Sequence, residues 1–352
     1  MESSRCLSKQ SKFYKTKLIV LVALIIFASQ GIASAFSLSA VGDVDLGGRV
    51  ASYINRYGYG YPYQNVKDLL SSTDLTFGNL ECALSVSGRP AAKKKYTFRG
   101  SPGNAPFLKK AGFDVMSIAN NHSKDFGNQA FLDTVNCLVN AQVVPVGGGA
   151  NLAGAFQPQV VEVDGQKIAF LAFSDVVPAG FAASSSSPGT ASLRNWRAVA
   201  SAITDAKSKA SFVVVSVHWG KELSAYPAQR QIKLAHQMID QGADLIIGHH
   251  PHVVQGVEIY RSKIIAYSLG NFIFSPGSSK GRQSVILSIR ADRGKITGAR
   301  IYPVYISGIQ PRILTGSQGQ KWLGEVSKRS RKFKTPLTMV TSEAYPYLRL
   351  PF

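Results

Sequence analysis

Short apolar runs rich in β-branched residues alternate with amphipathic helical patterns along most of this sequence, and this alternation constrains the fold more than any other feature. In the first half, the strand pattern occurs at residues 36–41, 74–79, 113–119 and 142–147. Helical spacing of apolar residues occurs between them, at residues 49–57, 64–72, 104–112 and 128–141. Such alternation is typical of an α/β domain and argues against an all-β sandwich.

The second half continues the pattern and then becomes richer in strands. Residues 159–165 and 167–175 flank an Asp-Gly turn and predict a hairpin, and a surface loop is expected at 176–192. Further elements are expected as helices at 197–210 and 227–243 and strands at 211–217 and 244–248. Four closely spaced strands follow at 254–260, 262–268, 284–291 and 295–305, which favours an antiparallel or mixed later sheet. We expect two packed sheets flanked by helices over residues 36–310, then a basic, poorly periodic extension over 311–352.

The charge balance indicates an anionic partner. Lys and Arg number 40 against 20 Asp and Glu, a formal net charge of +20. Such an excess favours a polyanionic substrate, an acidic membrane surface or nucleic acid. No helix-turn-helix, zinc-finger or RNA-recognition pattern occurs, so we expect no nucleic-acid partner. The basic residues are spread along the chain, and the alternative is that they are scattered solvated side chains.

The N-terminus predicts export. Five basic residues precede the uncharged apolar run Leu18–Ala28, and small residues ending at Ala35 follow it. This is the pattern of a secretory signal peptide over residues 1–35, cleaved after Ala35. If it is not cleaved, the tract is long enough to serve as a signal anchor. Either way, we expect the remainder outside the cytoplasm, secreted, periplasmic or held at the outer face of the membrane.

The three cysteines say little about the redox compartment. Cys6 falls in the expected leader, and Cys82 and Cys137 form no CxxC pair. We expect both of the latter to be reduced core residues.

Polar side chains with metal-binding potential follow five of the predicted strands. In chain order they are Asp43 and Asp45, Glu81, Asn121 and His122, His218, and His249, His250 and His252. In open α/β sheets the carboxyl ends of strands border the ligand-binding crevice. We therefore expect these five loops to converge on one place.

Carboxylates, an amide oxygen and imidazoles without thiolates suit Zn, Mn or Fe in mixed nitrogen and oxygen sites. Each element alone has a simpler explanation: an Asp or Asn after a strand is a common turn former, and His218 could be a satisfied buried histidine. The HHPH cluster could lie on the surface. His236 differs, because it lies among apolar residues at helical spacing, and we expect it to be structural.

Taken in order, these loops resemble the CapA (PgsA) proteins of bacterial poly-γ-glutamate capsule synthesis, whose domain is similar to calcineurin-like metallophosphoesterases. The matching stretches are GDVDLGGR, GNLECALS, YTFRGSP, FDVMSIANNHSKDFG, SVHWGKE, GADLIIGHHPHVVQGVE and AYSLGNFIFS. They extend from about residue 37 to residue 275. The resemblance implies a four-layer α/β fold with two mixed β-sheets between helices, and a centre that holds two divalent metal ions.

The resemblance also implies roles for individual residues. Metal ligands would be Asp43, Asp45, Glu81 as the bridging carboxylate, Asn121, His218, His250 and His252. In phosphoesterases the first motif is D-x-H, whereas Asp45 stands here at the histidine position, which puts one ligand in doubt. His122 would assist the leaving group, with Asp125 as its orienting partner. Residues that contact the substrate or support the ligands would be His249, Glu222, Asn271 and Arg99.

Three hypotheses remain open at the level of sequence. One is a metal-dependent hydrolase acting on a phosphoester or on an amide-linked polyanion such as poly-γ-glutamate. Another is a non-catalytic accessory that binds or exports an acidic cell-surface polymer, together with a membrane synthase or exporter. No GxxxxGK[ST] loop occurs, so the chain does not use a phosphate loop of that kind to drive polymer synthesis. A degenerate phosphoesterase fold kept as a scaffold is a third alternative.

Overall fold

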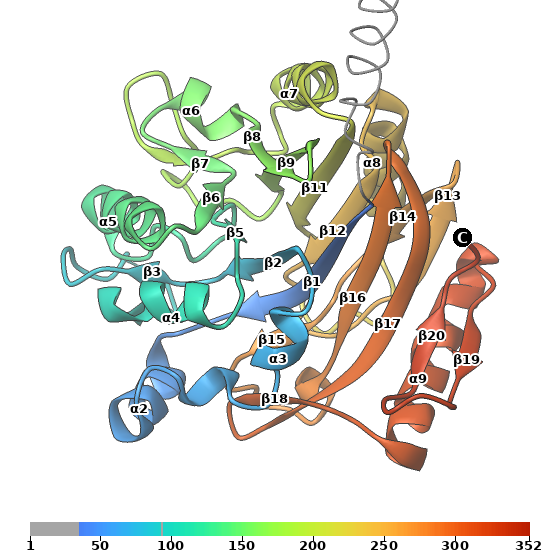
Figure 1. The fold of residues 1–352 in the computed structure, drawn as a ribbon. Helices are drawn as coiled ribbons and strands as arrows, with labels where there is room; N and C mark the ends of the chain where they lie inside the picture. Colours follow the sequence, from blue (N-terminus) through green and yellow to red (C-terminus); the bar gives the residue numbers. More distant parts are fainter. Residues whose placement is uncertain (1–34, 93) are drawn as a thin grey trace, which may run out of the picture. The chain divides into compact units, whose positions relative to one another are not determined.

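The computed structural model describes residues 35–92 and 94–352 of the chain. Residues 35–352 form one compact unit, shown in Figure 1. The signal peptide or anchor predicted at residues 1–35 lies outside the described residues but for its last one. Within the described part, no helix has both the length and the apolar character needed to cross a bilayer.

A ten-stranded sheet forms one half of the described fold. Its strands are β1 (Phe36–Val44), β2 (Leu75–Leu80), β5 (Val115–Ser117), β6 (Val144–Val146), β15 (Asn271–Ile273), β16 (Gln283–Asp292), β17 (Lys295–Ser307), β18 (Gln310–Ile313), β19 (Thr338–Val340) and β20 (Tyr347–Arg349). The order is β19-β20-β17-β16-β1-β2-β5-β6, with β15 beside β1 and β18 beside β17. Strands β1, β2, β5 and β6 are parallel, whereas β16 and β17 run antiparallel to their neighbours.

A six-stranded sheet forms the other half, in the order β13-β14-β12-β11-β9-β8. Its strands are β8 (Gln159–Val163), β9 (Gln166–Ser174), β11 (Phe212–His218), β12 (Leu245–His249), β13 (Val257–Tyr260) and β14 (Lys263–Ala266). The four central strands are parallel, and the two edge strands are antiparallel. Two short pairs lie outside these sheets: β3 (Ala83–Leu84) with β4 (Arg99–Gly100), and β7 (Gly148–Gly149) with β10 (Gly189–Thr190).

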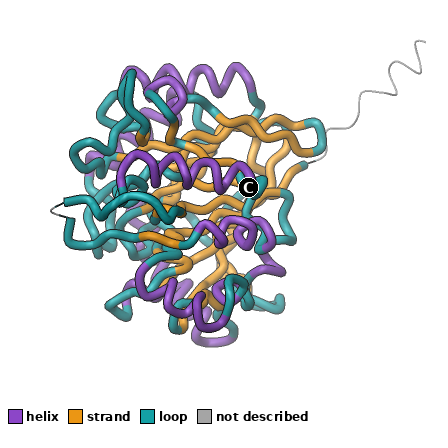
Figure 2. Tube along the Cα trace, turned by 90° about the vertical axis from the view of Figure 1, so that its left-hand side faces the viewer, coloured by secondary structure: helices purple, strands orange, loops and turns teal. Residues whose placement is uncertain are grey.

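Helices cover the outer faces of both sheets, as Figures 1 and 2 show. On the ten-stranded sheet they are α2 (Gly48–Tyr57), α3 (Lys67–Leu70), α4 (Ala105–Lys110) and α5 (Gly127–Asn140). On the six-stranded sheet they are α6 (Leu152–Phe156), α7 (Trp196–Lys209) and α8 (Gln229–Gln241). Single 3₁₀ turns are η1 (Tyr61–Tyr63), η2 (Pro102–Asn104), η3 (Lys280–Arg282) and η4 (Arg331–Phe333).

The main apolar core lies between the two sheets. Its side chains come from strands of both sheets. Aromatic rings meet between the sheets: Phe77 of β2 stacks on Phe170 of β9, and Phe36 of β1 packs edge-on against Phe212 of β11. Separate clusters join each sheet to its helices. The four-layer α/β fold with two mixed sheets is therefore confirmed.

The four late strands do not form a sheet of their own, which differs from the sequence expectation. Strands β13 and β14 extend the six-stranded sheet, whereas β16 and β17 return to pair with β1. Alternating apolar residues fit either sheet equally well, so only the chain path decides the partner.

Residues 311–352 are more ordered than their weak periodicity suggests. Helix α9 (Gly316–Ser330) buries Trp322, Leu323 and Val326 against the inter-sheet core, and β20 pairs with β17. Among the described cysteines, Cys82 is buried, Cys137 is half-buried, and both are free. Nε2 of His236 lies 2.9 Å from the Oε1 acceptor of Glu258, and its ring stacks on Tyr260, as expected for a structural histidine.

Candidate metal centre

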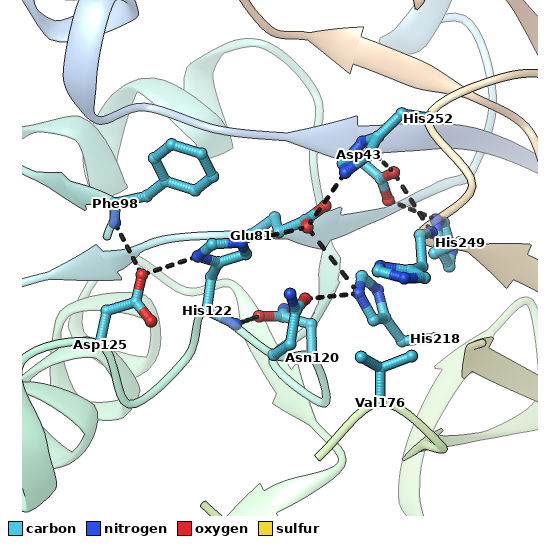
Figure 3. Close-up of polar contacts among 12 residues, drawn as sticks. Asp43, Glu81, Phe98, Asn120, His122, Asp125, Val176, His218, His249 and His252 are labelled. Atoms are coloured by element: carbon cyan, nitrogen blue, oxygen red, sulfur yellow. Dashed lines mark hydrogen bonds and ion pairs between the residues drawn. The ribbon is translucent and has the colours of Figure 1, made fainter. Parts of the chain in front are cut away.

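The strand-end loops of both sheets meet at one edge of the fold, where Figure 3 shows their side chains facing one another. Strands β1 and β2 are in register at Asp43 and Asn79, and strands β11 and β12 at His218 and His249. Parallel pairing brings the carboxyl ends of β1 and β2 to one edge of their sheet, and those of β11 and β12 to one edge of theirs. Close contacts of Asp43 with His249 and of Glu81 with His218 join the two edges. The convergence expected from the sequence is what the structure contains.

Asp43 lies at the centre of the first set of contacts. Its Oδ1 lies 3.2 Å from Nδ1 of His249, and its Oδ2 lies 3.4 Å from Nδ1 of His252. Asn79 donates from Nδ2 to Oδ1 of Asp43 at 2.9 Å. The backbone N–H of His250 donates to Oδ2 at 3.3 Å. Asp43 is fully buried, and these contacts hold its carboxylate towards the HHPH loop.

Glu81 lies among three imidazoles without bonding to any of them. Its Oε1 is 3.8 Å from Nε2 of His218, 3.8 Å from Nε2 of His252 and 4.0 Å from Nε2 of His122. Both of its oxygens are buried and have no hydrogen-bond partner among the residues that the structure describes, and the same holds for Nδ1 of His250. A buried carboxylate with no partner is expensive, and such groups are normally paired or coordinate metals.

The prospective ligand atoms form overlapping groups within 4.8 Å of one another. These groups are Glu81 with His218 and His250, Asp43 with Glu81 and His252, and Glu222 with His250 and His252. Glu81 belongs to the first two groups, which is the position a bridging carboxylate needs. The donor set of carboxylate oxygens and imidazole nitrogens fits divalent Zn, Mn or Fe. The residues present therefore fit a metal centre.

The charges of these groups are strongly coupled. Burial and the nearby Asp43 carboxylate raise the pKa of Glu81 well above its usual value. Burial opposes ionisation of Asp43 as well, but hydrogen bonds and charge from His249 and His252 hold its pKa well below the usual value. Burial would lower the pKa of His252, yet Glu81, Asp43 and the Asn271 oxygen outweigh it and raise the pKa to about 10.

The pKa values of His218 and His250 shift in the opposite direction to that of His252. Burial and the neighbouring His250 lower the pKa of His218 well below its usual value, and burial and His252 lower the pKa of His250 to about 4. Both imidazoles are therefore neutral at pH 7, which is the form that binds a metal.

The HHPH loop has a strained backbone. His250 has φ of 94° and His252 has φ of 56°. Residues with side chains rarely adopt this left-handed region, which costs about 1–2 kcal/mol each. This backbone conformation directs both imidazoles towards the carboxylates, and the surrounding structure must hold the loop in it.

His122 lies at the side of the cluster and is oriented by Asp125. Its Nδ1 is 2.7 Å from Oδ2 of Asp125, which leaves Nε2 facing Glu81. Asp125 is fully buried and also accepts from the backbone N–H of Phe98 at 2.7 Å. Lys94 forms an ion pair with Asp125 and donates to the backbone carbonyl of Asn121. The predicted partnership of His122 with Asp125 is present, and Lys94 is an addition that sequence reasoning missed.

Three asparagines hold the loops in place. Oδ1 of Asn121 lies 2.8 Å from Nε2 of His218, so both atoms face the same point. Asn120 accepts from the N–H of His122 at 3.0 Å and donates to Asn79 at 3.1 Å. Oδ1 of Asn271 lies 2.8 Å from Nδ1 of His252, which leaves Nε2 of His252 directed at Glu81.

Not every predicted site residue reaches the cluster. Asp45 is buried and accepts a hydrogen bond from the N–H of Gly47 at 2.7 Å. Burial raises the pKa of Asp45 to about 7. Asp45 belongs to none of the three groups of prospective ligand atoms. Glu222 is exposed but close to His250 and His252. Arg99 lies against the ring of Phe126 at 4.2 Å and is not among the residues that line the adjoining cleft.

That cleft opens beside the cluster and has a volume of about 540 Å³. Its lining includes Asp45, Arg49, Tyr96, Phe98, His122, Glu222, Leu223, His252, Asn271, Phe274 and the turn Ser275–Ser278. Arg49, Tyr96 and Phe274 were not singled out from the sequence. All three lie within matching stretches, GDVDLGGR, YTFRGSP and AYSLGNFIFS, and only that membership could have indicated them.

The fold and the site define a four-layer α/β protein with a histidine–carboxylate centre at its strand ends. Residues 37–276 match the family described as bacterial capsule synthesis protein PGA_cap. The chain is 32% identical over 287 residues to the capsule biosynthesis protein CapA of Bacillus anthracis, covering 80% of this chain and 70% of that protein. It is also 32% identical over 310 residues to the PGA biosynthesis protein CapA of Bacillus subtilis (strain 168), covering 88% and 78% respectively. The protein therefore belongs to the bacterial capsule synthesis family, and the predicted resemblance is confirmed.

Among solved structures, the 5'-nucleotidase of Candida albicans SC5314 is similar with a TM-score of 0.46 and 12% identity. That similarity covers 86% of this chain and 60% of the nucleotidase.

Proposed function

We propose that this protein acts outside the cytoplasm in the biosynthesis of an acidic cell-surface polymer, as a hydrolase with a centre for two divalent metal ions. The observation that carries the proposal is Glu81, whose two buried oxygens have no hydrogen-bond partner among the described residues, although three imidazoles lie 3.8–4.0 Å from Oε1. Divalent cations shared between Glu81 and its neighbours would satisfy these atoms.

The ligand groups suggest how the ions would be held. One ion would lie among Asp43, Glu81 and His252, and the other among Glu81, His218 and His250. Asn121 would join the second group, because its Oδ1 faces His218. Ions bound there would polarise a phosphoryl or carbonyl oxygen and activate a water molecule.

The chain's own residues would supply the proton for the leaving group. Asp125 fixes the ring of His122 through Nδ1, so the doubly protonated ring would give its proton from Nε2 towards the cleft. Burial lowers the pKa of His122, and the Asp125 carboxylate opposes that shift and favours the protonated ring. Asn120 fixes the backbone of His122, and Phe98 packs against its ring at 4.2 Å between centroids. Phe98 also excludes water from that side of the imidazole.

The location and the partners are part of the proposal. The leader pattern at residues 1–35 supports export or anchoring at the outer face of the membrane. Without the leader's five basic residues and one acidic residue, the remainder keeps a formal charge of +16, which suits poly-γ-glutamate or another acidic polymer. A membrane synthase or exporter would be the natural protein partner.

Metal content and turnover test this function. We expect purified protein loaded with Mn²⁺ or Zn²⁺ to bind two ions per chain and to hydrolyse phosphoesters or γ-glutamyl amides. His252→Ala and Asn121→Ala should each lose bound metal and turnover. His236→Gln is the matched control, because His236 lies outside the cluster and should keep both. Full activity in metal-free protein would refute the proposal.

A non-catalytic accessory role is the second candidate, and the net charge of +16 favours it. In that case, polymer binding should weaken as salt rises, because summed charge attraction is screened. It should also survive substitution of every ligand, including His252→Ala. Polymer binding that disappears with the metal would support the first candidate instead.

A further inference from the structure

The walls of the cleft beside the metal centre are largely apolar. Phe98 packs on His122 at 4.2 Å between ring centroids, and Phe274 packs on His252 at 5.0 Å. The two phenylalanines meet edge-to-face at 5.9 Å. They therefore form a corner directly against the imidazole that would protonate a leaving group and against a prospective metal ligand.

The rim of the cleft carries two apolar side chains that are open to solvent, beside the exposed Arg49 and Glu222. Tyr96 is 60% exposed and Leu223 is 57% exposed, and both line the cleft. Leu223 has a left-handed backbone with φ of 59°, which holds an apolar side chain at the surface at some conformational cost. Exposed apolar side chains beside a polar centre are typical of ligand-binding sites.

The charges in the cleft do not suit a run of carboxylates. Among the described residues that line it, Arg49 is the only lysine or arginine, and His252 at the metal cluster is the other cationic group, whereas Asp45 and Glu222 are acidic. A groove for a polyanion presents many cations along its length. The basic residues of this chain are instead spread elsewhere along the sequence.

We propose that the cleft takes a small phosphoester whose leaving group carries an aromatic or other flat apolar ring. This inference rests on the proposed function, since the phosphoryl group would lie at the metal centre. The ring would lie against Phe98 and Phe274, with Tyr96 and Leu223 covering its outer side. The bond cleaved joins phosphorus to the leaving oxygen, water supplies the new P–O bond, and His122 gives that oxygen its proton.

Binding of non-hydrolysable phosphonates to the metal-loaded protein tests the inference without depending on turnover. Benzylphosphonate should bind about tenfold more tightly than methylphosphonate, because burying an aromatic ring adds favourable apolar contact. Where turnover is present, benzyl phosphate should exceed ethyl phosphate in kcat/KM, although their leaving alcohols have similar acidity.

Substitutions at the rim locate the effect. Tyr96→Ser and Leu223→Ser should each lower the ratio of the two phosphonate affinities towards one. Tyr57→Ser is the matched control, because Tyr57 is 50% exposed and does not line this cleft; it should leave the ratio unchanged. Metal content measured on each variant separates loss of the ring site from loss of fold.

Three outcomes would overturn the inference, and only the third would overturn the proposed function as well. Equal affinity for the two phosphonates would overturn the ring site and leave the metal hydrolase standing. The ring site would also be overturned, with the metal hydrolase left standing, if an oligo-γ-glutamate displaced benzylphosphonate and bound more tightly. Failure of both phosphonates to bind the metal-loaded protein, together with no turnover of phosphoesters or of γ-glutamyl amides, would overturn both.

Discussion

Replacing Glu81 by glutamine should stabilise the metal-free protein and abolish most of its stabilisation by metal. In the absence of ions, both oxygens of Glu81 are buried and unpartnered, and its pKa is raised by burial and by Asp43. Glutamine has nearly the same shape but no charge. The variant therefore removes the electrostatic cost of the site while leaving its packing intact.

The size of the effect follows from the contacts. A buried polar atom without a hydrogen-bond partner costs about 1–3 kcal/mol, and a charged group costs more, which is the part that glutamine removes. Because glutamine is still polar, we expect Glu81→Gln to gain about 1–2 kcal/mol in the free energy of unfolding, or roughly 2–4 °C in Tm. Wild-type protein should gain about 2.7 kcal/mol from a metal at 100 times its Kd, whereas the variant should gain much less.

The gain should also depend on pH. A carboxyl whose folded-state pKa is raised destabilises the fold once pH exceeds its unfolded pKa of about 4.3, and the cost grows up to the folded pKa. The advantage of Glu81→Gln in chelator should therefore be larger at pH 8 than at pH 5. Thermal unfolding by calorimetry, in EDTA and in excess Mn²⁺, measures each quantity. A variant less stable than wild type in EDTA, or one with an undiminished metal shift, would refute the reasoning.

Three further substitutions test other parts of the structure. Lys94→Met should lower kcat for a phosphoester about tenfold or more at similar KM, because Lys94 joins its loop to Asp125 and Asn121. The control is Lys95→Met at the neighbouring position, which should not change steady-state kinetics. Gly42→Ala should cost roughly 2 kcal/mol or more in chemical denaturation and reduce bound metal, because its Cβ would lie 1.9 Å from a backbone carbonyl oxygen of the adjoining turn. Tyr267→Phe, which removes a buried 2.6 Å hydrogen bond to a glutamate, should cost about 1–3 kcal/mol and leave metal content unchanged.

The convergence of the strand-end side chains was predictable because each of them ends or follows a strand whose pattern is local. Asp43, Glu81 and His218 each end or follow a buried apolar run, and parallel strands deliver their carboxyl ends to one edge. Lys94 was not predictable, because it lies in a long aperiodic loop and reads as one of three consecutive lysines. Arg99 reads as a site residue from its motif, yet the short strand β4 directs it to the ring of Phe126.

The sequence by itself determined the alternation of strands and helices, the chemical type of each strand-end side chain and the family. These features are local, since they depend on residues adjacent along the chain. Only the tertiary structure decided that β16 and β17 join the first sheet, that Asp45 stays outside the ligand groups, and that an apolar corner borders the centre. The physical reason is that these outcomes depend on contacts between segments more than 100 residues apart, and many alternative pairings satisfy the same local pattern.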